Sequence, residues 1–148
     1  MTCCGSTKWC DAMLSKRPFA GIHQLLDLAE QSGDTLDAED WKQAFAAHPQ
    51  IGAKKMAAPV QSQRWSEEEQ AGAAAAATQV QEKLQQRNQE YHSRFGYIFI
   101  VCASGQSGEK MLATLEQRLH NDPTTELKVA AGEQRKITKL RLQKLLNP

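Results

Sequence analysis

The sequence DAEDWKQAFAAHPQIG, residues 37–52, contains both the start and the end of a helix. Asp37 followed by Asp40 is typical of a helix N-terminus. The residues that follow form one apolar face at helical spacing: Trp41, Ala44, Phe45 and His48. We therefore expect a helix that begins at Asp37 and carries His48 at its C-terminal end.

Pro49 sets the end of this helix. A proline disfavours the α conformation in the residue before it, so His48 leaves the helix, and Gly52 gives the following loop conformational freedom. A histidine with apolar residues behind it is most often a core residue whose ring nitrogens bond to the backbone. The alternative is a functional histidine, and this stretch alone favours the core reading.

A second marked stretch is Ser66-Glu67-Glu68-Glu69-Gln70. Ser66 and Glu69 have the spacing of a capping box, in which the serine oxygen accepts a backbone N–H and the glutamate reaches back. The acidic residues also suit the positive end of a helix dipole. A helix start at Ser66 therefore accounts for this stretch except for Gln70.

Length and charge limit the possible classes of protein. A chain of 148 residues fits one domain, residues 1–148, with a substantial core. The 18 basic and 17 acidic residues give a net charge of +1, so no long-range attraction to nucleic acid or to an anionic membrane is expected.

Neither a membrane segment nor a metal site is expected. No stretch approaches the roughly 20 apolar residues that cross a bilayer, and the first residues lack a signal-peptide pattern. The four cysteines form no CxxC pair, and a disulfide framework is typical of small exported proteins, so we expect reduced thiols. The sequence thus indicates a soluble, intracellular protein.

The remaining apolar patterns predict further helices. Helical spacing covers residues 7–14, then runs from Phe19 to a turn at residues 32–34, and the helix that starts at Ser66 extends to about Tyr91. Residues 53–64 are expected to form a connecting loop. Residues 104–107 form a turn that can cap a helix ending at residues 121–123, and a final helix covers about 125–146.

The most apolar run is FGYIFIVCA, residues 95–103. Its β-branched and aromatic content favours a strand, but no other segment offers a pairing partner, and a lone strand leaves backbone groups unpaired. We therefore expect a central buried helix or an extended entry into a helix, and an all-α fold.

Arg141 lies on an apolar face of the final predicted helix, four residues after Ile137 and four before Leu145. One explanation is that its stem packs while the guanidinium reaches water. The other is a clamp for an anion, because the guanidinium fork matches a carboxylate.

Four stretches in this order resemble the 2-oxo-4-hydroxy-4-carboxy-5-ureidoimidazoline (OHCU) decarboxylases of the urate-to-allantoin pathway. They are HPQIG, then Ser66-x-x-Glu69-Gln70, then FGYIFIVCASG, and finally EQRKITKLRLQKL. The resemblance begins at Cys4 and continues almost to Leu146. Each motif alone is weak, whereas their order and spacing are specific.

The resemblance implies a compact, single-domain, all-helical bundle. It also implies a cofactor-free carboxy-lyase, commonly a homodimer, that converts OHCU into (S)-allantoin with loss of CO2. It places the catalytic residues at His48 and Glu69, and the substrate contacts at Pro49, Ser66, Glu69, Gln70, Val101, Cys102, Ala103, Ser104, Gly105 and Arg141. Many relatives have Arg-Met where this chain has Ser104-Gly105, so contacts there are expected from the backbone.

The implied chemistry suits these residue types. The carbon that loses CO2 carries a hydroxyl and adjoins a ring C=N, which can take up the departing electrons. His48 would exchange a proton with the hydroxyl, while Glu69 and Gln70 hold the ureido and ring amides.

Two other functions fit parts of the sequence. A cysteine hydrolase would use Cys102 and His48, although an apolar neighbourhood makes a thiol inert. A non-enzymatic helical interaction module would need only helix faces and caps, and predicts that His48, Glu69 and Arg141 point in unrelated directions. The C-terminal Leu146-Asn147-Pro148 is not a peroxisomal address, so we expect the bacterial cytoplasm.

Overall fold

The computed structural model describes residues 2–51 and 78–147. The loop expected at residues 53–64 and the capping box at Ser66 lie outside these ranges. The described residues form six helices and no strand, as the all-α prediction requires. The helices are α1 (Thr7–Ser15), α2 (Ile22–Asp34), α3 (Ala38–Ala46), α6 (Thr78–Phe95), α7 (Gly108–Arg118) and α8 (Pro123–Leu146).

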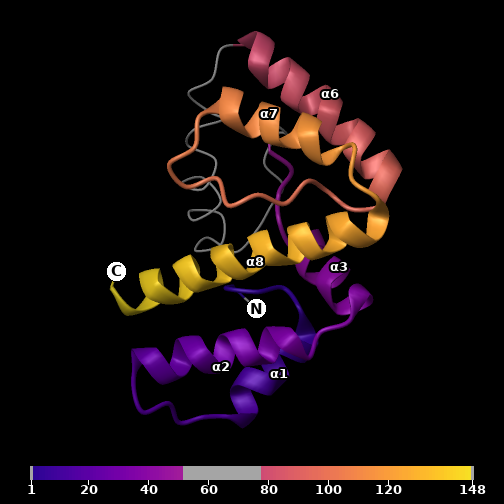
Figure 1. Ribbon diagram of the computed structural model, residues 1–148. Coiled ribbons are helices and arrows are strands. Elements are labelled where there is room, and N and C mark those ends of the chain that lie inside the picture. Colours follow the sequence, from indigo (N-terminus) through magenta and orange to yellow (C-terminus); the bar gives the residue numbers. More distant parts are fainter. Residues whose placement is uncertain (1, 52–77, 148) are drawn as a thin grey trace.

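The long helix α8 crosses the middle of the molecule (Figure 1). Helices α1 and α2 pack together on one side of it, and α6 and α7 pack together on the other. Helices α2 and α3 both contact α8, and α1 also contacts α3. The C-terminal end of α3 and the side of α8 therefore meet near the centre of the fold.

Side-chain caps begin three of these helices, and the sequence predicts those of α3 and α7. The Asp37 side chain accepts the Asp40 N–H and the Asp40 side chain accepts the Asp37 N–H, which completes a capping box for α3. Ser107 caps α7. Asp122 caps α8, and Pro123 occupies the first turn, so this helix starts two residues before the predicted position.

Helix α2 differs from its prediction at both ends. It begins at Ile22 rather than Phe19, and it continues through residues 32–34, where the sequence predicts a turn. Ser32 donates a hydrogen bond to the Leu28 carbonyl, and Gly33 faces the Arg135 side chain of α8. Contacts with another helix thus outweigh the turn propensity of these residues.

Residues 97–103 are not helical, so the alternative of a central buried helix is wrong. Helix α6 ends at Phe95, four residues beyond its predicted end, and Gly96 follows with a φ of 82°. Two side chains satisfy carbonyls of the run, since Arg118 donates to Ile100 and Gln106 donates to Cys102. The run enters α7 through the turn before Ser107.

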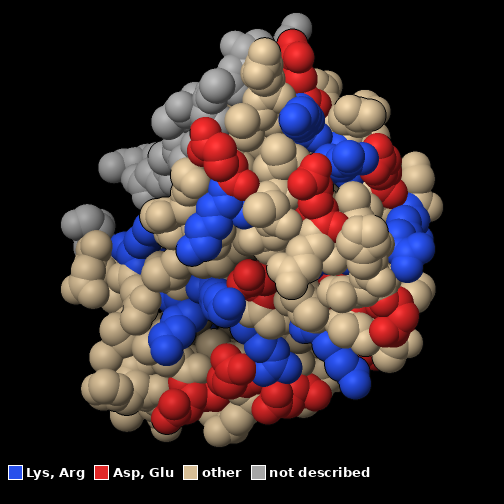
Figure 2. All heavy atoms as spheres, turned by 45° about the horizontal axis from the view of Figure 1, so that its top comes forward, with Lys and Arg blue, Asp and Glu red and all other residues tan. Residues whose placement is uncertain are grey.

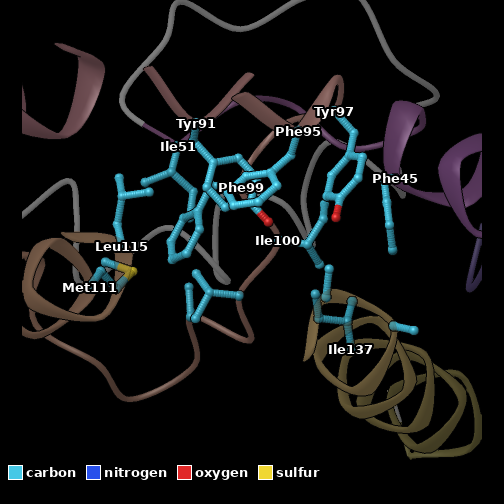
Figure 3. Packing of buried hydrophobic residues seen from close by; sticks show 14 of the residues in the cluster. Phe45, Ile51, Tyr91, Phe95, Tyr97, Phe99, Ile100, Met111, Leu115 and Ile137 are labelled. Atoms are coloured by element: carbon cyan, nitrogen blue, oxygen red, sulfur yellow. The ribbon is translucent and has the colours of Figure 1, made fainter. Parts of the chain in front are cut away.

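An aromatic cluster forms the centre of the core beside this run (Figure 3). Tyr91 stacks edge-on against Tyr97 and Phe99, with ring centroids 5.9 and 5.5 Å apart. Phe45 of α3 contacts Tyr97 with ring centroids 5.1 Å apart. The core therefore joins α3, α6 and the 97–103 run.

Within residues 2–51 and 78–147, no helix has both the length and the apolar content that a bilayer crossing requires.

Candidate active site

His48 lies two residues beyond the end of α3, as Pro49 requires. The His48 N–H bonds to the Phe45 carbonyl at 3.1 Å, which closes the last turn, and the half-buried imidazole faces α8. Helix α3 thus ends slightly earlier than predicted, and its end directs the histidine toward the central helix.

Two side chains of α8 contact the imidazole. The Nε2 atom of His48 lies 2.7 Å from Oε1 of Gln134, and Nδ1 lies 3.4 Å from a terminal nitrogen of Arg141. These contacts join residues that are 86 and 93 positions apart in the sequence. The histidine is therefore held by side chains and not only by the backbone.

The Arg141 guanidinium is buried rather than extended into water. The side chain is only 5% exposed, and NH1 donates to the Thr2 carbonyl at 3.1 Å. The explanation in which its charge reaches solvent is therefore wrong. Arg141 instead places a positive charge beside His48.

These surroundings lower the pKa of His48 to about 4, chiefly through desolvation of the imidazole and secondly through the positive charge of Arg141. The hydrogen bond to Gln134 acts in the opposite direction. At neutral pH the imidazole is therefore uncharged and can accept a proton.

One face of α8 supplies the support for this histidine. Gln134, Thr138 and Arg141 follow one another at spacings of four and three residues, and all three are buried. The Gln134 amide nitrogen bonds to the Thr138 hydroxyl at 3.2 Å. A polar stripe therefore runs along a central helix on the side that faces His48.

The N-terminal segment lies against the same face. Thr138 donates to the Cys3 carbonyl at 3.3 Å, while Thr2 accepts from Arg141 as described above. The same segment also passes close to the end of α3. Gly5 allows this, because a Cβ atom at this position would clash with the Ala47 Cβ. Residues from both ends of the chain thus form the surroundings of His48.

The other proposed site residues fall into two groups. Ser66, Glu69 and Gln70 lie outside the described residues. Pro49 is half-buried beside His48. Val101 and Ala103 are buried, Cys102 is half-buried, and Ser104 and Gly105 lie in an exposed turn in which Gly105 has a φ of 73°. Among the described residues, the side-chain hydrogen bonds of His48 go to α8 and not to this run.

The sequence reasoning missed Gln134 and the side chains that support the 97–103 run. Gln134 could have been found from its spacing to Arg141, seven residues later on the same face. The run is anchored by Arg118, whose NH1 donates to the Ile100 carbonyl at 2.7 Å and whose Nε donates to Glu126 at 2.7 Å. No local pattern predicts that anchor, because its members come from three separate segments.

The cysteines are free thiols, as expected. Burial raises the pKa of Cys3 to about 11 and also raises that of Cys4.

Charges on the face shown in Figure 2 are of both signs and intermingled, in keeping with a net charge of +1.

Comparison with known proteins identifies the family of this arrangement. The family model for OHCU decarboxylase matches residues 1–143. The "2-oxo-4-hydroxy-4-carboxy-5-ureidoimidazoline decarboxylase" of Mus musculus is 33% identical over 138 residues, which cover 91% of this chain and 76% of the mouse protein.

A plant protein and a solved structure are also similar. The "Uric acid degradation bifunctional protein TTL" of Arabidopsis thaliana is 36% identical over 148 residues, and the match covers 98% of this chain but only 45% of the plant protein. The "Crystal structure of OHCU decarboxylase in the presence of (S)-allantoin" superposes with a TM-score of 0.86 at 34% identity and covers 99% of this chain and 95% of that one.

Proposed function

The chain belongs to the OHCU decarboxylase family, and we propose that it decarboxylates OHCU to (S)-allantoin. The observation that carries this proposal is the contact between the half-buried His48 and the buried Arg141. It joins a neutral imidazole to a permanent cation. A substrate that carries a hydroxyl and a carboxylate on one carbon needs a base and a cation side by side.

Arg141 binds the substrate carboxylate and His48 receives the hydroxyl proton. The guanidinium forms charge-assisted hydrogen bonds with a carboxylate, and burial strengthens them. Bound at Arg141, the carboxylate offsets the positive charge that opposes protonation of His48. The substrate therefore makes the imidazole more basic when it binds.

Loss of CO2 then breaks the bond between the ring carbon and the carboxylate. The electron pair forms a C=C bond to the neighbouring carbon, and the C=N electrons move to the ring nitrogen, which takes up a proton. The hydroxyl proton passes to Nδ1 of His48 as the carbonyl forms, and protonation of the carbon that bears the ureido group gives allantoin. Overall, one proton replaces the departing CO2.

The side of protonation decides the product's handedness. We assign this selection to the contacts implied by the family resemblance: Glu69 and Gln70 on the ureido and ring amides, Ser66 and Pro49 beside them, and backbone groups of Val101–Gly105. Fixed orientation of the ring exposes one face to the proton donor.

The proposal extends to a homodimer, on the basis of the family resemblance, and to a location in the bacterial cytoplasm, as the sequence analysis expects. Light scattering during size-exclusion chromatography tests the assembly against the chain mass of 16.5 kDa. A mass of one chain would reject the dimer and leave the chemistry untouched.

The function is tested by circular dichroism of OHCU generated from urate by the two preceding reactions. OHCU decays unaided to racemic allantoin, so we expect the protein to accelerate the change and to leave a lasting (S)-allantoin signal. His48→Asn should abolish the acceleration. His23→Asn, at an exposed position on α2, is the matched control and should retain it.

A racemic end point with folded protein would reject the enzyme and favour the interaction module. The convergence of His48 and Arg141 already argues against that module. Retained activity in Cys102→Ser would reject the cysteine hydrolase.

A further inference from the structure

A chain of hydrogen bonds behind His48 has a fixed direction. It begins at the Cys3 carbonyl, which can only accept. The Thr138 hydroxyl donates its one proton to that carbonyl, so towards Gln134 the Thr138 oxygen can only accept. Both Cys3 and Thr138 are at most 6% exposed, so bulk water does not compete for these positions.

This direction determines how the Gln134 amide is oriented. Its NH2 group must face Thr138, at 3.2 Å, and its carbonyl oxygen must then face His48, at 2.7 Å. Gln134 is fully buried, so a reversed amide would place its oxygen against the Thr138 oxygen, with no proton between the two acceptors. The amide is therefore held in one of its two orientations.

The same reasoning applies to the imidazole. An oxygen at 2.7 Å from Nε2 requires a proton on Nε2, and the Arg141 guanidinium, which can only donate, faces Nδ1 at 3.4 Å. Both neighbours select the same neutral tautomer, with Nε2 protonated and a lone pair on Nδ1. The Nδ1 contact is the longer of the two and the easier one to replace by a substrate oxygen.

We propose that Gln134 is a positioning residue that holds His48 in the Nε2–H tautomer, so that the lone pair of Nδ1 receives the substrate's proton. Thr138 and the Cys3 carbonyl fix the orientation of Gln134. The kinetic consequence rests on the proposed decarboxylase function, whereas the tautomer itself does not.

The first test needs no substrate and no variant. In the intact protein with ¹⁵N-labelled histidine, NMR should show that His48 has a protonated Nε2 and an unprotonated Nδ1 at neutral pH. A protonated Nδ1, or an equal mixture of the two tautomers, would overturn the proposal.

Two substitutions at Gln134 should shift the pKa of His48 in opposite directions. Gln134→Met keeps the length of the side chain but removes the acceptor, so the pKa of His48 should fall and the other tautomer should become populated. Gln134→Glu places a carboxylate beside Nε2, so the pKa of His48 should rise. A residue that only fills space would not move this pKa in opposite directions, and shifts of the same sign would overturn the proposal.

Kinetic measurements then test the positioning role of Gln134 separately from the proposed decarboxylase activity. Gln134→Met should lower kcat by roughly 10- to 100-fold with a smaller change in KM, the range found for groups that orient metal-bound histidines. Thr138→Val should lower kcat less, and Thr138→Ser should restore it because the hydroxyl is kept. An active wild type with unchanged kcat in Gln134→Met would overturn the proposal, whereas a wild type with no activity on OHCU would reject the decarboxylase and leave the NMR result standing.

Discussion

Arg118 and Arg141 are buried to the same extent, each with 5% of its surface exposed, yet their neighbours differ. Arg118 pairs with the carboxylate of Glu126, bonds to the Ile100 carbonyl, and lies over the Phe99 ring with 4.5 Å to the centroid. Arg141 bonds to the Thr2 carbonyl and lies against the base His48.

The difference separates an arginine that is paired with a carboxylate from one that contacts a titratable imidazole. The Arg118 charge lies against an opposite charge, so the pair holds α7, α8 and the 97–103 run together. Desolvation is the main cause of the lowered pKa of His48, and the Arg141 charge adds to it, so both keep the imidazole neutral. Burial alone does not distinguish the two roles, whereas the neighbour of the charge does.

The largest expected effect is the loss of the carboxylate of Glu126. Glu126→Gln leaves Arg118 buried beside a neutral amide, and breaking a buried ion pair in this way costs about 3–5 kcal/mol in the free energy of unfolding. Urea denaturation followed by far-ultraviolet circular dichroism measures this loss. A cost below about 1 kcal/mol would contradict the structural role of the pair.

Arg141→Met should affect activity more than stability. Removal of the cation takes away the proposed carboxylate clamp, so kcat/KM should fall by about 100- to 1000-fold, as for other groups that bind charge at a reacting centre. The described contacts of Arg141 go to the uncharged Thr2 carbonyl and the neutral His48 imidazole, so the free energy of unfolding should change less than in Glu126→Gln. The opposite order of the two stability losses would break the comparison.

The same variant makes a prediction about pH. Without the positive charge, the pKa of His48 should rise from about 4, but it should stay below 6.5 because desolvation remains the main cause. Any remaining activity should therefore decline at a higher pH than in the wild type as the solution is acidified. An NMR titration that gives the wild-type pKa would contradict the role assigned to Arg141.

The smallest effect is expected at Arg87, which is 39% exposed and pairs with Glu90 and Glu116. Because water screens both pairs, Arg87→Met should lower the free energy of unfolding only slightly. The urea experiment that measures Glu126→Gln measures this variant beside it. A larger loss would mean that ion pairing matters more here than burial.

Local chemistry made much of the fold predictable from the sequence. The caps at Asp37 and Ser107 are decided by residues within one turn, and the structure contains both. The stop before Pro49 is also local. His48 and Arg141 drew attention for the same reason, because each stands on an apolar face where its residue type is unusual.

The rest depends on residues that are distant in the sequence. No other segment of the sequence offers the 97–103 run a backbone partner, so a local reading does not predict that it stays extended. Arg118 and Gln106 provide side-chain partners instead, and nothing near the run indicates the first of them. Likewise, the contact between Gln134 and His48 depends on the fold, in which the end of α3 lies opposite α8.

The contacts around His48 can form only after nearly the whole chain has been synthesised. The bonds from Thr2 to Arg141 and from Cys3 to Thr138 join residues 139 and 135 positions apart. At about 5–20 residues per second, synthesis exposes the N-terminal segment well before α8 is made. A nascent chain without α8 has neither Gln134 nor Arg141, so its histidine keeps an ordinary basicity until the last helix emerges and docks.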